Sequence, residues 1–391
     1  MKKVIFGTAL ASMALLSACS SDNELANVET TANNAIGFHV VGNKAETRAT
    51  PITSTNLNKT DFKVYAFTKD GKAFMGENDT EHAWNGINIK YKGGKWDYAN
   101  ESDLRYWPNS SLDFYAVNPG TFEKGSYSEG MEGNYTWKIA SSSQTIYYKA
   151  TDEYGHTSEL EKSKNIDVMY GIAKDQKYTA ENGGKVTFQF KHILSQVVFK
   201  AKTALANMEV KIKEIKIHNF RFGGYFTLPT AEATEGSWKL DDPVIPTMKW
   251  GTFTVVKDKD INVTSTGAEI SVDAPMLFVP QTLVAWKTSS TTAKPKADAD
   301  TSGEAYLEIT CKIKQEGEYV FGSESEYKTL YVPFGPTWEI GKRHIYTLIF
   351  GGGYDEHGQT ILKPINFEAE TTNWVDDIKN NNNGNDINIG K

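Results

Sequence analysis

Short alternations of apolar and polar residues, broken by turn residues, dominate this chain and constrain its fold more than any other feature. At residues 36–41 the apolar Ile36, Phe38 and Val40 alternate with small or polar residues, which predicts a strand with one buried face. Gly, Asn, Asp and Ser separate this run from the next ones, as in chains that turn between antiparallel strands. Comparable runs follow at residues 62–67, 86–92, 112–117, 135–139, 145–148 and 168–172.

The second half of the chain continues the same pattern. Residues 185–202 give two apolar runs, and in residues 210–217 apolar residues alternate with lysines, which predicts either a strand or a bulged pair, with one apolar face. No amphipathic helical period lies between these runs, so we predict an all-β chain of two antiparallel β-sandwiches. Later strands are predicted at residues 253–256, 276–279, 306–313, 329–332, 345–350 and 361–369.

Length and composition support two cores. The chain has 391 residues and 12% aromatic residues, enough apolar side chains for two domains and a mixture that favours strands over helices. We predict an N-terminal sandwich at residues 35–204 and a C-terminal sandwich at residues 205–375. The tail at residues 376–391 contains four consecutive Asn, followed by a brief alternation of Ile387 and Ile389, and is predicted to be flexible because it has few apolar residues.

The N-terminus has the features of a lipoprotein signal. Two lysines precede an apolar run at residues 4–16, and small residues lead from it to Cys19. The run is too short for a stable membrane span. We therefore predict that residues 1–18 are a signal peptide, that Cys19 is lipidated, and that residues 19–34 tether the fold to the outer membrane. The alternative is a secretory signal followed by an incidental cysteine.

The chain lacks the sequence patterns of a metal site, of a phosphate-binding loop and of nucleic-acid binding. The seven His residues are dispersed, and Cys311 has no partner once Cys19 carries lipid, so neither a zinc site nor an internal disulfide is expected. The triple glycine at residues 351–353 does not lead into a capped helix. The net charge is −7, with Lys and Arg scattered along the chain, which argues against a nucleic-acid partner. We predict no catalytic residue, metal or cofactor, and no enzymatic activity.

Several short landmarks follow one another in a fixed order behind the signal. Together they resemble the fimbrillin family of Bacteroidales, the Mfa-like and FimA-like pilin lipoproteins, over nearly the whole chain. The landmarks are Thr47-Arg48-Ala49, Tyr106-Trp107-Pro108, Asp167-Val168-Met169-Tyr170, residues 190–195, Phe278-Val279-Pro280-Gln281, Trp338, Tyr346 and Trp374.

The resemblance implies a fold of two transthyretin-like β-sandwich domains and a place in a cell-surface fimbrium. In such pilins an Arg-specific protease cuts behind the first strand, the strand leaves, and a C-terminal strand of the neighbouring subunit fills the groove. In this sequence the cut is expected between Arg48 and Ala49. The strand that would leave is residues 36–41, in which Ile36, Phe38 and Val40 face the core.

The donor strand is less clear from the sequence. Candidate donor residues are Ile361, Ile365, Phe367, Ile387 and Ile389, although the first three also suit the chain's own second sandwich. The resemblance therefore leaves open a stalk, an accessory or a tip subunit. Its expected partners are other fimbrial subunits, the outer membrane, the Arg-specific protease, and a ligand on a host or bacterial surface.

A non-polymerising surface lipoprotein that binds glycan or host matrix is the alternative function. Exposed aromatic side chains stack on sugars, and Trp84 and Trp96 flank a predicted hairpin turn at residues 92–95. Trp107 is expected in the core instead, because it stands in a family landmark.

Overall fold

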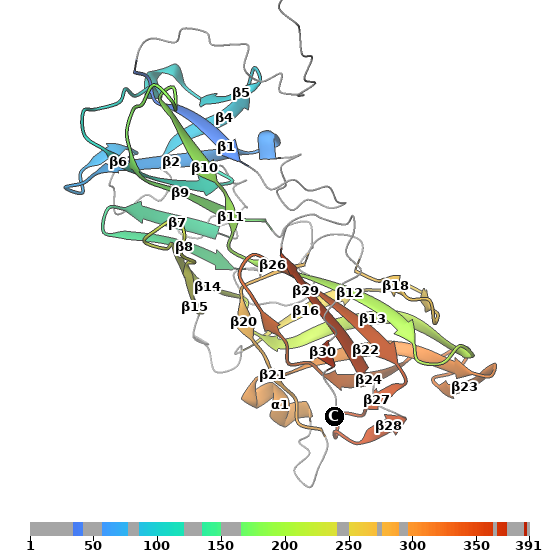
Figure 1. Ribbon diagram of the computed structural model, residues 1–391. Coiled ribbons are helices and arrows are strands. Elements are labelled where there is room, and N and C mark those ends of the chain that lie inside the picture. Colours follow the sequence, from blue (N-terminus) through green and yellow to red (C-terminus); the bar gives the residue numbers. More distant parts are fainter. Residues whose placement is uncertain are drawn as a thin grey trace, which may run out of the picture.

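The computed structural model describes residues 34–41, 57–76, 86–120, 135–149, 166–240, 250–271, 276–288, 296–362, 366–373 and 387–388. Most regular elements of these residues are strands (Figure 1), so the predicted all-β class is confirmed. The described helices are short: η1 (Leu57–Lys59), η2 (Glu101–Asp103) and α1 (Lys296–Ser302). Five predicted site residues lie outside the described residues, namely Cys19, Arg48, Ala49, Ile365 and Ile389.

The N-terminal end of the molecule is a large twisted sheet with the order β10-β1-β5-β4-β2-β6-β9-β11, in which β3 also pairs with β2. The predicted turn at residues 92–95 joins β4 to β5, and Gly93 and Gly94 there have φ of 59° and 83°, as a tight hairpin turn requires. The strands are β1 (Gly37–Val41), β2 (Asp61–Thr68), β3 (Ala73–Met75), β4 (Ile87–Lys92), β5 (Lys95–Tyr98), β6 (Leu112–Asn118), β9 (Met169–Gln176), β10 (Lys185–Gln189) and β11 (Lys191–His192).

A four-stranded sheet with the order β15-β14-β8-β7 covers one face of this large sheet. Its strands are β7 (Tyr135–Ala140), β8 (Ser143–Lys149), β14 (Gly223–Thr227) and β15 (Ser237–Leu240). Trp137 and Phe226 from the four-stranded sheet pack with Tyr65 and Tyr115 from the large sheet. Strands from both sides of the boundary predicted at residues 204/205 therefore share one sheet, and the division of the chain into two domains stays a prediction.

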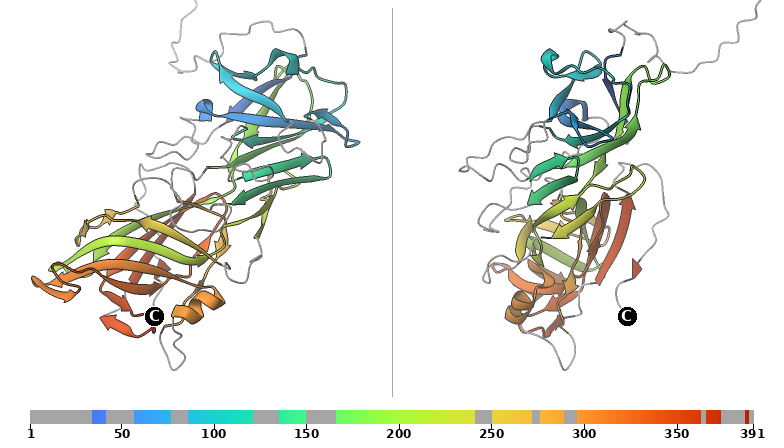
Figure 2. Two further views of the ribbon diagram at one scale, coloured as in Figure 1. Left: turned by 180° about the vertical axis from the view of Figure 1, so that it is seen from behind. Right: turned by 90° about the vertical axis from the view of Figure 1, so that its left-hand side faces the viewer.

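The other end of the molecule is formed by two further sheets (Figure 2), with the orders β18-β12-β26-β29-β30 and β16-β13-β22-β24-β27-β28. β17, β21 and β23 also join the second of these sheets, β19 joins the first, and β20 pairs with β25. Their strands are β12 (Ser195–Thr203), β13 (Met208–Phe220), β16 (Gly251–Val256), β17 (Ile261–Val263), β18 (Ala268–Glu269), β19 (Met276–Phe278), β20 (Gln281–Thr282), β21 (Val284–Ala285), β22 (Glu304–Gln315), β23 (Glu318–Phe321), β24 (Lys328–Pro333), β25 (Thr337–Trp338), β26 (Lys342–Phe350), β27 (Gly352–Tyr354), β28 (Thr360–Leu362), β29 (Asn366–Asn373) and β30 (Ile387–Asn388).

The two sheets enclose one apolar core, which includes Phe199, Phe253, Phe278 and Trp338. The sequence left a regular strand and a bulged pair open for residues 210–217, and the structure has the bulge, because β13 shifts its register against β22 between Ile212 and Glu214.

Two details differ from the predicted pattern of strands. Most ladders are antiparallel, but β1 runs parallel to β10, β12 runs parallel to β26, and the two-residue strand β21 runs parallel to β22. The single run predicted at residues 361–369 is two strands, β28 and β29. The sequence between them contains Pro364, which has no N–H for a strand ladder.

Candidate functional site

The candidate site is the position of β1, the strand that the sequence analysis marks as removable. β1 pairs in parallel with β10, from Gly37 opposite Lys185 to Val41 opposite Gln189, and it contacts β5 where Phe38 lies opposite Trp96. The chain continues from β10 into β11, which pairs with β9 at the far side of the same sheet. Because β10 lies on one side of β1 and β5 on the other, β1 occupies a slot between two strands and is not an edge strand.

Alternate side chains of β1 are buried. Ile36, directly before the strand, is 1% exposed and Phe38 is 5% exposed, Val40 packs partly against the same core, and Val41 is 45% exposed. The ring centroid of Phe38 lies 5.6 Å from that of Tyr98. Burial of each large apolar side chain is worth about 1.5 to 3 kcal/mol, so β1 contributes to the stability of the sheet mainly through Ile36 and Phe38.

The N-terminal end of β1 is fixed by hydrogen bonds to the last residue of β5 and to the segment after it. The Ile36 N–H donates to the Arg105 carbonyl at 2.9 Å, and the Tyr98 hydroxyl donates to the Ile36 carbonyl at 3.0 Å. Burial raises the pKa of Tyr98, which keeps this hydroxyl protonated as a donor. Nearby, the indole N–H of Trp107 donates to the Gly184 carbonyl at 2.8 Å. These hydrogen bonds hold the N-terminal end of the strand in place in addition to its apolar packing.

A chain without β1 would carry an open slot at this place. Phe62 and Phe188, whose ring centroids each lie 6.3 Å from that of Phe38, would lose an aromatic neighbour. The backbone groups of β10 that pair with β1 would lose their ladder partners. An apolar slot flanked by unpaired strand edges can accept another extended segment, since strand addition supplies both backbone bonds and alternating side chains.

The described candidate donor residues lie in the chain's own sheets. Ile361 in β28 is paired with Gly353, and Phe367 in β29 is paired with Leu348. Ile387 in β30 is paired with Ala369 on the outer edge of β29. The structure thus does not bring these residues to the slot of β1 within one chain.

The tryptophans differ in their placement. Trp107 is 8% exposed, as predicted for a core residue, and Trp137 is 2% exposed, with its indole N–H donating to the Tyr65 hydroxyl at 2.8 Å. Trp96 packs partly against the core, with its ring centroid 5.0 Å from that of Phe62, so its ring is less free to stack on a sugar than the sequence suggested. Trp84 lies outside the described residues.

Sequence reasoning missed Tyr98 and Gly184 as partners of the first strand. Tyr98 ends a predicted hairpin and is one of 19 tyrosines in the chain. Only its hydrogen bond to the Ile36 carbonyl, which the sequence does not reveal, distinguishes it from the other tyrosines. Gly184 has φ of +76°, and a Cβ there would lie 2.9 Å from the Ala35 carbonyl oxygen. The pair Gly183-Gly184 directly before a strand was the one signal that could have indicated a close backbone approach.

Other chemistry is limited in the part of the chain that the structure describes. No group of three or more His, Cys, Asp or Glu side chains there could hold a metal ion. No helix among the described residues is both long and apolar enough to cross a membrane. His192 Nδ1 lies 3.0 Å from Asp167 Oδ1. Cys311 is fully buried, and burial raises the pKa of its thiol, so it is poorly suited to act as a nucleophile.

The model of the fimbrillin-like family matches residues 47–374, and no curated protein matches the chain. A fimbrial protein from Bacteroides vulgatus is similar in structure, with 16% identity, a TM-score of 0.49, and coverage of 88% of this chain and 100% of that chain. The fimbrial anchor protein Mfa2 from Porphyromonas gingivalis has 9% identity and a TM-score of 0.32, with coverage of 87% of this chain and 98% of its own. Because the family model spans most of its length, the chain belongs to the fimbrillin-like family.

Proposed function

We propose that this chain is a subunit of a cell-surface fimbrium that is exported as a lipoprotein through Cys19, cut after Arg48, and assembled by donor-strand exchange. Membership of the fimbrillin-like family supports the fimbrial role and the surface location. The observation that supports the exchange step is the position of β1, because Ile36 and Phe38 are buried in a slot between β10 and β5.

The proposed cut changes how β1 is held. Before the cut, β1 is connected to β2 through residues 42–60. After a cut behind Arg48, the N-terminal piece is held only by its hydrogen bonds and its buried side chains, and it can be replaced by a strand with the same alternation. A contact in which each subunit fills the slot of the next one is head-to-tail and does not close, so it builds a filament.

The tail at residues 376–391 is the proposed donor. Ile361 and Phe367 already take part in ladders within the chain, so donating them would cost those ladders. Ile387 and Ile389 alternate in the manner that the slot requires, and the described part of the tail gives up only the two-residue strand β30 when it leaves.

The experiment is to express residues 20–391 without lipid, add an Arg-specific protease, sequence the new N-terminus, and run the product unboiled on a denaturing gel. We expect one cut before Ala49, followed by a ladder of detergent-resistant species. Arg48→Ala should remain uncut and monomeric, while Lys44→Ala, a change of another basic residue in the same stretch, should behave as the wild type.

Truncation after residue 375 tests separately whether a subunit accepts a donor strand and whether it donates one. The truncated chain should be cut normally and should form no ladder by itself. When it is mixed with the full chain, it should accept the tail of a full chain and so appear in one additional band. A clean cut without a ladder in the full chain would contradict the stalk role and favour a tip or accessory subunit. Resistance at Arg48 would contradict activation by proteolysis and favour a surface lipoprotein that does not polymerise.

A further inference from the structure

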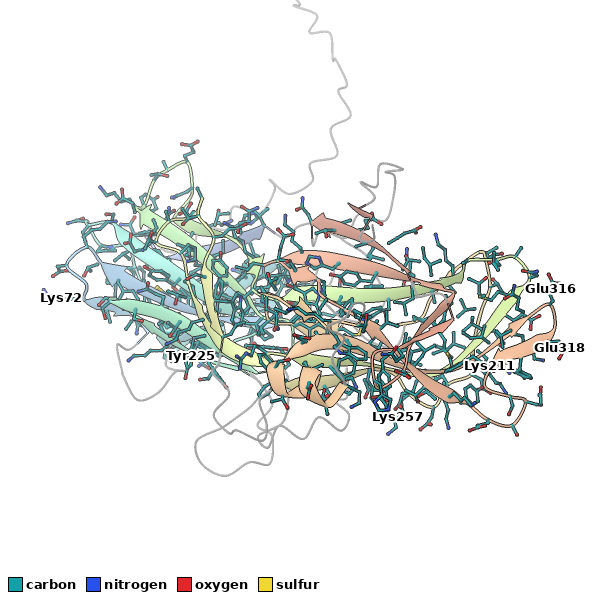
Figure 3. All side chains as sticks on the ribbon, turned by 90° about the horizontal axis from the view of Figure 1, so that it is seen from below. Lys72, Lys211, Tyr225, Lys257, Glu316 and Glu318 are labelled. Atoms are coloured by element: carbon teal, nitrogen blue, oxygen red, sulfur yellow. The ribbon has the colours of Figure 1, made fainter. Side chains whose placement is uncertain are left out.

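A groove lies directly beside the C-terminal end of β1. Its volume is about 460 Å³, and Val41, the last residue of β1, is part of its wall together with residues of β9, β10 and the loop between β14 and β15. The two sheets that border it form the half of the molecule in which Figure 3 labels Lys72 and Tyr225. A segment that enters the slot of β1 from this end must therefore pass the groove.

The two long sides of the groove are strand edges. Among the residues that the structure describes, β10 has no ladder partner other than β1, and β11 pairs with only Met169 and Tyr170 of β9. Further along β9, the Lys174 N–H donates to Glu232 Oε1 at 2.6 Å. A side-chain oxygen thus takes the place that the carbonyl of a neighbouring strand could take. Edges of this kind can bind an added extended segment.

The side chains of the groove offer amides and a hydroxyl. Gln176, Thr187 and Gln189 line it, and Thr187 and Gln189 are exposed. A primary amide both donates and accepts, so it can form two hydrogen bonds with another amide. The charged lining residues have opposite signs, and the Lys191 ammonium donates to the Glu232 carbonyl at 2.5 Å. The groove therefore suits an extended segment that is rich in amide groups.

A sugar fits this groove less well than a peptide does. The aromatic residue of the lining is Tyr170, which is 3% exposed, and its ring centroid lies 5.3 Å from that of Phe226. Its ring is covered and offers little face on which a sugar could stack. Backbone and side-chain amides of a peptide need no such face.

We propose that this groove is the docking site for the Asn-rich run, residues 380–386, of a second copy of this chain. The inference rests on the proposed function, in which the tail at residues 376–391 is the donor. The run contains five Asn in seven residues and directly precedes Ile387 and Ile389. Its amides match the Gln and Thr side chains of the groove, and the two isoleucines that follow match the apolar slot.

Docking at this end determines the direction of the incoming strand. With residues 380–386 in the groove, Ile387 and Ile389 enter the slot from its C-terminal end and reach the positions of Val40 and Phe38. The incoming strand then runs opposite to β1, and hence antiparallel to β10.

This reversal favours the incoming strand over β1. β1 forms its long ladder, from Gly37 to Val41, in parallel with β10, and it meets β5 at the single position of Phe38. Parallel pairing is slightly less stable per residue than antiparallel pairing. An incoming strand that is antiparallel to β10 improves the longer of the two ladders.

The first test measures docking while β1 is still in place. A fluorescein-labelled peptide of residues 376–391 is titrated with uncut protein of residues 20–391, and binding is followed by fluorescence anisotropy. We expect saturable binding that falls at least tenfold when the five Asn of residues 380–386 are replaced by Ser. A peptide with Ile387→Ala and Ile389→Ala should bind as the unmodified peptide does, because the slot is occupied.

Variants of the protein locate the binding site. Gln189→Ala should weaken binding of the peptide at least fivefold. Gln359→Ala, at an exposed glutamine between β27 and β28, should leave it unchanged, and thermal unfolding establishes that each variant keeps its fold. Absence of binding, or binding that Gln189→Ala leaves unchanged, would overturn the proposal. So would loss of binding by the peptide without the two isoleucines, since that peptide lacks only the side chains for the slot.

The second test measures the direction of the strand in assembled protein. Gln189 lies opposite Val41 in the ladder, and a reversed donor brings Asp386 to the position of Val41. Gln189→Cys combined with Asp386→Cys should therefore form a disulfide between subunits after cleavage, whereas Gln189→Cys combined with Gly390→Cys should not. A ladder of species with the opposite pattern of disulfides would overturn the docking and leave strand exchange intact. The peptide test uses uncut protein, so its result does not depend on cleavage or exchange.

Discussion

At the scale of single residues, a few buried polar contacts determine how β1 and the C-terminal sheets are held. The hydroxyl of Tyr98 donates to the Ile36 carbonyl from inside the N-terminal core. In the C-terminal sheet, His344 is 2% exposed and its Nε2 accepts the Glu339 N–H at 3.0 Å, so the ring proton is on Nδ1, which lies 3.2 Å from Thr371 Oγ1. Each contact is specific enough to be tested by one substitution.

Tyr98→Phe should loosen β1 while keeping the aromatic packing. The variant leaves the Ile36 carbonyl without its phenol donor, and an unsatisfied buried acceptor costs about 1 to 3 kcal/mol. We expect the free energy of unfolding in urea to fall by this amount and β1 to be released faster after proteolysis. Tyr178→Phe, at a tyrosine that is 43% exposed, is the control. An equal loss in the control would contradict the assigned role of the bond.

His344 should make the chain less stable in acid. Burial, assisted by nearby Lys342, lowers the pKa of His344 from 6.5 to about 4. The unfolded chain therefore binds more protons between these values, and the contribution to stability is fully present above pH 6.5 and is lost as the pH falls towards 4. The loss amounts to at most about 3 kcal/mol.

Urea unfolding at pH 7 and pH 4.5 measures this dependence. His344→Gln should reduce the difference between the two pH values, because Gln does not titrate. His357→Gln, at a side chain that is 69% exposed, should leave the difference unchanged. An unaltered pH dependence in His344→Gln would show that other groups carry the effect.

At the scale of elements, the length and the position of β1 matter together. It has five residues, and it lies inside the sheet order with neighbours on both sides. A strand in this position is needed to complete the sheet, but few residues must be extracted to remove it. Its alternation of buried and exposed side chains is also simple enough for another strand to reproduce.

Phe38→Ala should destabilise the N-terminal sheet far more than a change at the end of the same strand. Phe38 is 5% exposed and has three aromatic neighbours, so its truncation is expected to cost about 3 to 5 kcal/mol. Val41→Ala, at a residue that is 45% exposed, should stay within about 0.5 kcal/mol of the wild type. Chemical denaturation of both variants gives the comparison, and similar losses would contradict the buried seat of β1.

At the scale of the whole molecule, the two halves of the chain share structure. β14 and β15 follow the predicted boundary in the sequence, but they complete the sheet of β7 and β8. The indole N–H of Trp238 in β15 also donates to the Ile193 carbonyl at 2.9 Å. The core between the two N-terminal sheets therefore includes residues far past the predicted boundary, among them Phe226, Leu277 and Val279.

A fragment of residues 35–204 should fail to form a native core. Without β14 and β15 it lacks Phe226, whose ring centroid is 5.3 Å from that of Tyr170, and the apolar side of β8 is exposed. We expect the fragment to bind the dye ANS and to give poorly dispersed NMR spectra, unlike residues 20–391. Cooperative unfolding and dispersed spectra of the fragment would instead support a boundary at residues 204/205.

Local sequence patterns were enough to predict the all-β class, most strand positions and the hairpin at residues 92–95. Alternation and turn residues are local signals, and they report which face of a strand is buried. The tertiary structure alone decided that β1 lies between β10 and β5, that β14 joins β8, and that Tyr147 meets Tyr225. Strand pairing connects residues far apart in the chain, and an alternating pattern fits many neighbours equally well. Only packing of the whole chain selects one of them.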